Sequence, residues 1–112
     1  MKDYEVLKGK YPNLYKNSLY FECGPGWYDI IDNLSSKLEK LIDPSMEFPT
    51  YATQVKEKYG TLRFYLSTET DEMGKLVDEA EELSSHTCEI CGLPGKLIDS
   101  GGWYETRCDQ CK

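Results

Sequence analysis

The sequence predicts an α+β fold in which amphipathic helices pack on a β-hairpin, with a small cysteine-rich module at the C-terminal end. Three observations lead to this prediction. Apolar residues recur at helical spacing through residues 27–42, alternating stretches flank Gly60, and two C-x2-C pairs lie in residues 88–111. The spacing separates helix from strand because side chains return to one face every ~3.6 residues in a helix and every ~2 residues in a strand.

The first elements are short. Apolar residues among positions 4–7 indicate a helix that ends at the break Tyr11-Pro12-Asn13, since proline does not continue a helix. An apolar stretch over residues 18–22 then runs into Cys23-Gly24-Pro25-Gly26. The two glycines and the proline allow the backbone to bend sharply there.

The helix that follows is the clearest element of the chain, and Pro44 ends it. Its apolar stripe has the helical period of about 3.6 residues, which is typical of a helix that packs against a core. The stripe comprises Trp27, Ile30, Ile31, Leu34, Leu38, Leu41 and Ile42. We therefore expect this helix to form much of the core.

A β-hairpin is expected next, with Gly60 in a tight turn that needs positive φ. The predicted apolar face is formed by Tyr51, Thr53 and Val55 from the first arm and by Leu62, Phe64 and Leu66 from the second. We expect this face to lie on the preceding helix. A second helix is predicted from about Glu69 to Ser85, with Thr68 as N-cap. Its predicted buried stripe is Met73, Leu76, Val77, Ala80 and Leu83.

The cysteines of residues 86–112 have the spacing of a zinc ribbon, because 16 residues separate two C-x2-C pairs. Two residues between sulfurs let a backbone knuckle point both thiolates at one ion, and Gly92 eases the turn. Residues 96–99 and 103–107 are the expected arms of a small hairpin. Since four cysteines fill a tetrahedral site, we expect a structural Zn²⁺. The predicted ligands are Cys88, Cys91, Cys108 and Cys111.

Other uses of these cysteines stay open at this point. Disulfides suit an oxidising compartment, a thioredoxin-like pair uses one C-x2-C at a strand-to-helix junction, and an iron–sulfur cluster also takes four cysteines. His86 is a substitute metal ligand or a solvated residue. Cys23 is either a small buried thiol or a nucleophile. No Ser-His-Asp, HExxH, Walker A or GxGxxG pattern occurs, so we expect no enzyme.

Length and charge restrict the function. The 112 residues suffice for a small α+β domain in residues 1–85 and a zinc ribbon module in residues 86–112. The net charge is −7, of which residues 69–82 supply −6 through seven acids and one base. This balance argues against nonspecific binding to nucleic acid. The absence of a signal peptide or membrane-spanning run leads us to expect a cytoplasmic protein.

Basic and aromatic residues indicate where a ligand could bind. The window from Lys56 to Arg63 has a net charge of +2. Gly24-Pro25-Gly26 leads into the Trp27 helix, and free amides at a helix start attract anions. We therefore predict a site for a compact anionic, nucleotide-like ligand. Its candidate residues are Trp27, Tyr28, Lys56, Lys58, Thr61, Arg63 and Tyr65. The alternative is that the bases are simply solvated and that Trp27 belongs to the core.

Three segments occur in a recognisable order: FECGPGWY at residues 21–28, QVKEKYGTLRFY at 54–65, and TCEICGLPGK with GGWYETRCDQC at 87–111. Together they resemble a family of small proteins encoded by bacteriophages and prophages, over most of the chain from residue 12 onward. Similar proteins often carry a longer segment in place of residues 43–49. Some have histidine in place of Cys111, which implies a metal-ligand role there. The resemblance supplies no activity, but it implies an accessory protein in the cytoplasm of an infected bacterium.

Two functions from different classes follow. The first is a non-enzymatic, anti-defence protein that captures a small nucleotide-like signal. The second is an interaction module whose acidic helix, residues 69–82, inhibits a host bacterial protein by docking on a basic surface, although such a charge run is also what a solvated helix face shows. Direct nucleic-acid binding through the ribbon is disfavoured by its few bases. A homo-oligomer stays open, and no membrane partner is expected.

Overall fold

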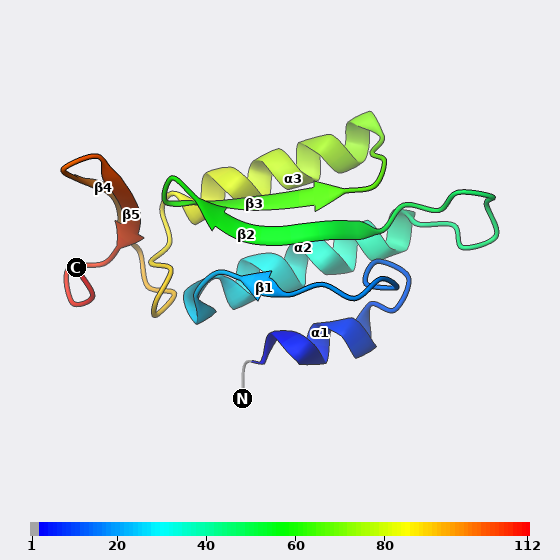
Figure 1. Ribbon diagram of the computed structural model, residues 1–112, viewed down its shortest axis with the longest axis horizontal. Helices are drawn as coiled ribbons and strands as arrows, with labels where there is room; N and C mark the ends of the chain where they lie inside the picture. Colours follow the sequence, from blue (N-terminus) through cyan, green and yellow to red (C-terminus); the bar gives the residue numbers. More distant parts are fainter. Residues whose placement is uncertain (1–2) are drawn as a thin grey trace.

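The computed structural model describes residues 3–112, and over these residues the fold is mixed α+β with three α-helices and two small sheets (Figure 1). Residues 1 and 2, which the predicted first domain includes, lie outside the described residues. The elements are α1 (Tyr4–Lys10), β1 (Phe21–Glu22), a 3-10 turn η1 (Pro25–Trp27), α2 (Tyr28–Leu41), β2 (Ala52–Lys58), β3 (Thr61–Leu66), α3 (Asp71–Ser84), β4 (Lys96–Ser100) and β5 (Trp103–Arg107).

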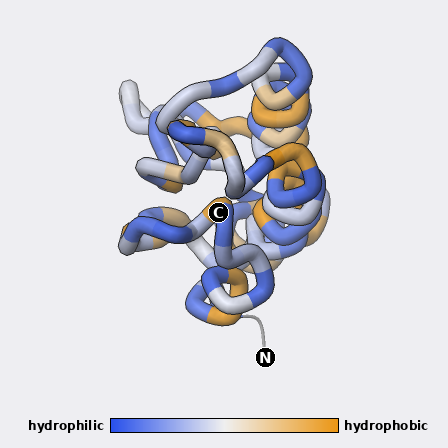
Figure 2. The backbone as a smooth tube through the Cα atoms, turned by 90° about the vertical axis from the view of Figure 1, so that its right-hand side faces the viewer, coloured by the Kyte–Doolittle hydropathy of each residue, from blue (hydrophilic) through white to orange (hydrophobic). Residues whose placement is uncertain are grey.

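The layers are simple. The helices α2 and α3 lie together on one side of the β1–β2–β3 sheet (Figures 1 and 2), and the other face of the sheet has no helix on it. The cysteine module, residues 86–112, lies at one end of the molecule, which measures 46 × 30 × 19 Å. No helix within residues 3–112 is both long enough and apolar enough to cross a membrane.

The predicted hairpin is confirmed. Strands β2 and β3 pair antiparallel, with Val55 opposite Phe64 on the buried face. Both turn residues have positive φ, 54° at Tyr59 and 82° at Gly60, as a two-residue type I′ turn requires. The sequence pattern indicated only Gly60, because tyrosine is an unusual residue at such a φ.

The first arm departs from the predicted alternation. The pairing shifts register between Ala52 and Gln54, so Ala52 and Val55 are both buried while Thr53 between them is exposed. The prediction that Thr53 lies on the apolar face is therefore wrong. A β-bulge adds one residue to a strand and reverses the faces on one side of it.

Strand β1 was not predicted as a strand. It has two residues and pairs in parallel with β2, through Phe21 opposite Val55 and Glu22 opposite Lys56. Two residues are too few to show alternation, and the pairing joins segments more than 30 positions apart.

Helix α3 is shifted from its prediction at both ends. Thr70 rather than Thr68 is the N-cap, and its hydroxyl accepts a hydrogen bond from the Met73 amide at 3.2 Å. The hydroxyls of Thr68 and Thr50 instead lie 3.0 Å apart. Leu83 is 56% exposed, contrary to the prediction, and Ser84 takes the buried place. The Ser84 hydroxyl accepts a hydrogen bond from the Leu62 amide at 2.9 Å and so joins α3 to β3.

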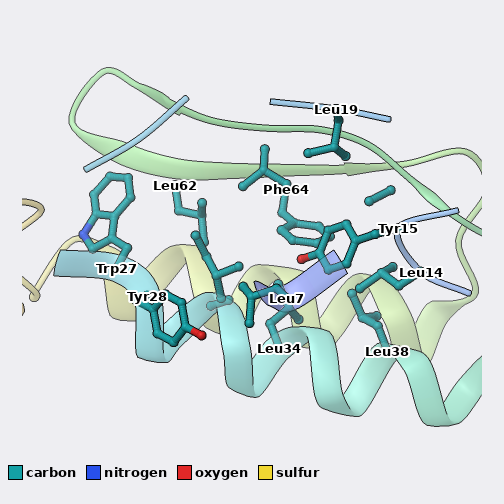
Figure 3. Close-up of a cluster of buried hydrophobic side chains, with 14 of the residues drawn as sticks. Leu7, Leu14, Tyr15, Leu19, Trp27, Tyr28, Leu34, Leu38, Leu62 and Phe64 are labelled. Carbon is teal, nitrogen blue, oxygen red and sulfur yellow. The ribbon is translucent and has the colours of Figure 1, made fainter. Parts of the chain in front are cut away.

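Helix α2 agrees with its prediction and organises the core (Figure 3). Trp27, Ile31 and Leu38 from the stripe are fully buried, and Leu34 and Ile42 are nearly so. Leu7, Leu14 and Tyr15 from the first segment and Leu62 and Phe64 from β3 complete the same cluster. Leu41 is the exception: the predicted stripe includes it, but at the end of the helix it is exposed.

The positions of Leu38 and Leu41 yield a test of this core. Leu38→Ala should lower the free energy of unfolding by about 2–5 kcal/mol, because it leaves a cavity among close-packed side chains. Leu41→Ala makes the same change in the same helix and should cost less than about 1 kcal/mol. Urea unfolding followed by circular dichroism measures both. Equal losses would contradict the packing described here.

Candidate metal centre and ligand-binding face

The four cysteines predicted from spacing come together in the structure. The sulfurs of Cys88, Cys91, Cys108 and Cys111 all lie within 4.8 Å of one another, and all are free thiols. Cys88 and Cys108 are buried, whereas Cys91 is exposed. Disulfides are absent from residues 3–112. The cluster could therefore hold one metal ion, and the module is compatible with a zinc ribbon.

Each C-x2-C pair forms a backbone knuckle beside the β4–β5 hairpin. The Gly92 amide donates to the Cys88 carbonyl at 2.9 Å, and the Cys111 amide donates to the Cys108 carbonyl at 3.2 Å. Gly92 has φ +84°, so glycine is needed at this turn, as the sequence indicated. Two pairs of residues far apart in sequence thus present their sulfurs to one point.

The backbone around Cys88 favours its thiolate. Burial raises the pKa of Cys88, but hydrogen bonds from the amides of Cys91, Cys108 and Ile90 outweigh this and bring the pKa to about 6. The pKa of Cys111 is raised, first by its hydrogen bond to the Cys108 sulfur and then by burial. Closely spaced thiols cannot all ionise easily without a cation among them.

His86 is not one of the clustered groups. Its ring nitrogen Nε2 lies 3.1 Å from Oε1 of Glu82, one turn earlier along α3, and both side chains are exposed. The alternative that His86 replaces a cysteine ligand is therefore not supported by its position.

The first knuckle docks on the loop before α2 through Glu89. The Gly26 amide donates to the Glu89 carbonyl at 2.7 Å, and the Gly24 amide donates to the Glu89 carboxylate at 2.7 Å. The Arg107 guanidinium lies 3.3 Å from the same carboxylate, and both side chains are largely buried. Trp27 adds a hydrogen bond from its indole Nε1 to the Thr87 carbonyl at 2.9 Å.

This docking corrects the prediction of a free anion site at Gly24-Pro25-Gly26. An amide there does bind a carboxylate, as an unpaired N–H at a helix start favours, but the carboxylate is the chain's own Glu89. The glycines are needed for the approach, since a Cβ at Gly26 would lie 2.1 Å from the Cys88 carbonyl oxygen. A Cβ at Gly24 would lie 2.5 Å from the Glu89 carbonyl oxygen.

The predicted ligand residues divide into two groups. Lys56 pairs with Arg63, Lys58 with Thr61, and Tyr65 with Gln54, so these five predicted residues do share the outward face of the hairpin. Trp27 and Tyr28 do not join them. Both are buried in the core (Figure 3), because the first turn of α2 directs its apolar stripe against the sheet. The alternative that Trp27 is a core residue is the one the structure supports.

One ion pair and two further contacts reduce the positive charge that this outward face offers. Nη1 of Arg63 lies 2.8 Å from Oε1 of Glu81, which comes from the acidic helix α3. Glu22 lies next to Lys56 in the sheet register. Lys58 has its ammonium 5.5 Å from the centre of the Tyr59 ring. The positive charge available to a ligand therefore rests mainly on Lys56 and Lys58.

Cys23 has the environment of a small buried thiol. It is half-buried, and its sulfur lies 3.7 Å from the Tyr4 hydroxyl. Burial raises the pKa of Cys23 to about 11, so the thiol stays protonated at neutral pH. A protonated thiol is a weak nucleophile, which speaks for the structural interpretation.

No known protein-family model, curated protein or solved structure matches the chain. The resemblance to phage proteins therefore stays a prediction.

The close contact at Gly26 generates a second test. Gly26→Ala should lower the free energy of unfolding by about 3 kcal/mol or more, since the new methyl group collides with rigid backbone. Gly9→Ala is the matched control, because a Cβ at Gly9 meets nothing within 4 Å. Alanine favours helix, so Gly9→Ala should stabilise by up to about 1 kcal/mol. Thermal unfolding compares the two, and a tolerated alanine at position 26 would contradict the docking geometry.

Proposed function

We propose that the cysteine cluster holds one structural Zn²⁺ and that the chain is a non-enzymatic protein that captures a small anionic, nucleotide-like ligand. The cluster of four sulfurs within 4.8 Å supports the metal. Cys88, Cys91, Cys108 and Cys111 would complete a tetrahedral site with no position for water, so the ion would organise the fold and would not activate a substrate.

The basic outward face of the hairpin is the observation that supports ligand binding. Lys56 and Lys58 lie on the sheet face that has no helix on it, where a negatively charged molecule could reach both ammonium groups. A sequestering protein needs affinity and no nucleophile, and this fits the protonated, half-buried state of Cys23. The resemblance to bacteriophage proteins adds an expected context, in which the captured molecule is a signal of a bacterial antiviral system.

The acidic helix supports a second candidate function. Glu72, Asp78, Glu79 and Glu82 are exposed on α3, and Leu83 is exposed beside them. Carboxylates around an exposed apolar side chain would be complementary to a partner surface that is basic and has a small hydrophobic depression. Inhibition of a host protein through this helix is the corresponding proposal.

The metal proposal predicts about one zinc per chain in freshly purified, reduced protein, measured by elemental analysis. Chelation should lower the melting temperature by more than about 10 °C, because metal binding and folding of such sites are coupled. Cys108→Ser should lose the zinc, whereas Cys23→Ser should keep it. Clearly less than one zinc per chain, or a melting curve that chelation leaves unchanged, would count against a structural site.

The ligand proposal predicts binding in calorimetry against a panel of cyclic nucleotides, mononucleotides and ADP-ribose derivatives. The double variant Lys56→Ala, Lys58→Ala should bind about ten-fold more weakly or worse, since charge-assisted hydrogen bonds are lost. Lys37→Ala with Lys40→Ala removes the same charge from α2 and should leave affinity unchanged. If no nucleotide binds and a host protein co-purifies with the chain, the sequestration proposal is wrong and the acidic helix becomes the better explanation.

A further inference from the structure

A hollow of about 370 Å³ lies where the tips of the two hairpins meet. It is lined by Glu57, Lys58, Tyr59, Gly102, Trp103 and Tyr104. The first three residues come from the β2–β3 hairpin and the last three from the β4–β5 hairpin. Of these residues, only Lys58 belongs to the ligand set predicted from the sequence. The volume is at the lower end of the ~300–1,000 Å³ typical of small-molecule sites.

Large aromatic rings are exposed in this hollow. Trp103 is 69% exposed and Tyr59 is 65% exposed. The rings of Tyr59 and Tyr104 meet edge to face, with centroids 6.4 Å apart. These side chains contribute little to the core, so burial does not explain the tyrosine in the β2–β3 turn or the two aromatic residues at the start of β5. Turn positions in water are usually polar or glycine.

The backbone holds these rings in place. Tyr59 is the one non-glycine residue of positions 3–112 with φ in the left-handed region, a conformation that costs a bulky residue free energy. The next residue, Gly60, is wedged against the module, since a Cβ there would lie 2.5 Å from Cδ1 of Leu97. The Thr106 hydroxyl donates to the Gly60 carbonyl at 2.6 Å. Strain at an exposed tyrosine in a fixed turn points to a role at the surface.

The second turn is fixed as well. The Gly102 amide donates to the Asp99 carboxylate at 2.8 Å, and Ser100 pairs with Trp103 at the end of the β4–β5 ladder. Both walls of the hollow are therefore pre-organised, which lowers the entropy cost of binding a ligand between them.

The hollow contains one basic side chain, Lys58, and one acidic side chain, Glu57. Lys58 holds its ammonium 5.5 Å from the Tyr59 ring centre. The Glu57 carboxylate accepts a hydrogen bond from the Gly60 amide at 2.7 Å and is thereby tied to the turn. One ammonium beside exposed rings matches a flat ring that carries one phosphate. To bind a nucleic-acid strand, a protein needs several basic side chains along the phosphate backbone. The hollow has only one basic side chain, Lys58.

We propose that the base of a mononucleotide stacks on Trp103 and Tyr59 in this hollow and that Lys58 binds its phosphate. This inference rests on the proposed nucleotide-capturing function and gives it a location and a ligand class. It also moves the site from the buried Trp27 and Tyr28 to the junction of the two hairpins. Stacking requires exposed ring faces, which the hairpin tips have and the core residues lack.

Tryptophan fluorescence tests the proposal directly, because the chain has two tryptophans and Trp27 is fully buried. The probes are the four 5′-ribonucleoside monophosphates, with adenosine, inorganic phosphate and a ten-residue oligodeoxyadenylate as separate arms. At least one monophosphate should quench Trp103 emission with saturation. In Trp103→Phe, which keeps a ring at this position, calorimetric binding should persist while the fluorescence response disappears.

Calorimetry on substituted chains completes the test. Trp103→Ala should weaken monophosphate binding about ten-fold or more, the size of a lost stacking interaction. Phe48→Ala removes a ring that is 78% exposed away from the hollow and should leave binding unchanged. Lys58→Ala should weaken binding of AMP but not of adenosine. Circular dichroism and zinc content, equal to wild type, show that each variant folds.

Four results would overturn the proposal. If a monophosphate binds wild type and Trp103→Ala equally, the hollow is not the site, although the nucleotide-capturing function stands. If no monophosphate binds while another member of the nucleotide panel binds through Lys56, the same conclusion holds. If the oligodeoxyadenylate binds far more tightly than AMP, the hollow belongs to a nucleic-acid surface. Absence of binding by every nucleotide would remove the inference and the proposed function together.

Discussion

The contact between Glu89 and the Gly24–Gly26 loop is the interaction on which the rest of the structure depends. The carboxylate of Glu89 is largely buried, and a buried carboxylate is tolerated only when hydrogen bonds and an opposite charge surround it. The Gly24 amide and Arg107 meet this requirement. Both glycines are needed because any side chain would collide with the knuckle backbone. The contact joins the cysteine module to the first turn of α2 and thereby fixes the module on the core.

The cysteine cluster and the hollow between the two hairpins are linked through this contact. Glu89 lies between two cysteines of the cluster, so the knuckle that carries two of the gathered sulfurs also docks on the loop. The same docking brings the β4–β5 turn beside the β2–β3 turn, where Gly60 packs against Leu97 and Thr106. The hollow between the turns has one wall from each part of the chain. Its rings keep their relative positions only while the module stays docked.

One of the acidic residues of α3 has a structural role, whereas the others lie at the surface. Glu81 from α3 holds the guanidinium of Arg63 at 2.8 Å and so secures the edge strand β3 to the helix. The other acids of α3 remain at the surface. A net charge of −7 repels extended polyanions, which is consistent with the proposal of a small anionic ligand and not of a nucleic-acid strand.

The sequence by itself determined the elements whose signals are local. Helical spacing predicted α2, alternation around Gly60 predicted the hairpin, and two C-x2-C pairs predicted the gathered sulfurs, since each pattern reflects neighbours along the chain. Tertiary structure alone decided that Thr53 bulges outward, that Leu83 is exposed, and that Tyr28 belongs to the core. It also decided that the Gly24 amide binds Glu89, 65 positions away, and that Tyr59 meets Tyr104. These outcomes depend on packing and hydrogen bonds between segments that are far apart in the sequence. Such contacts leave no periodic pattern in the sequence.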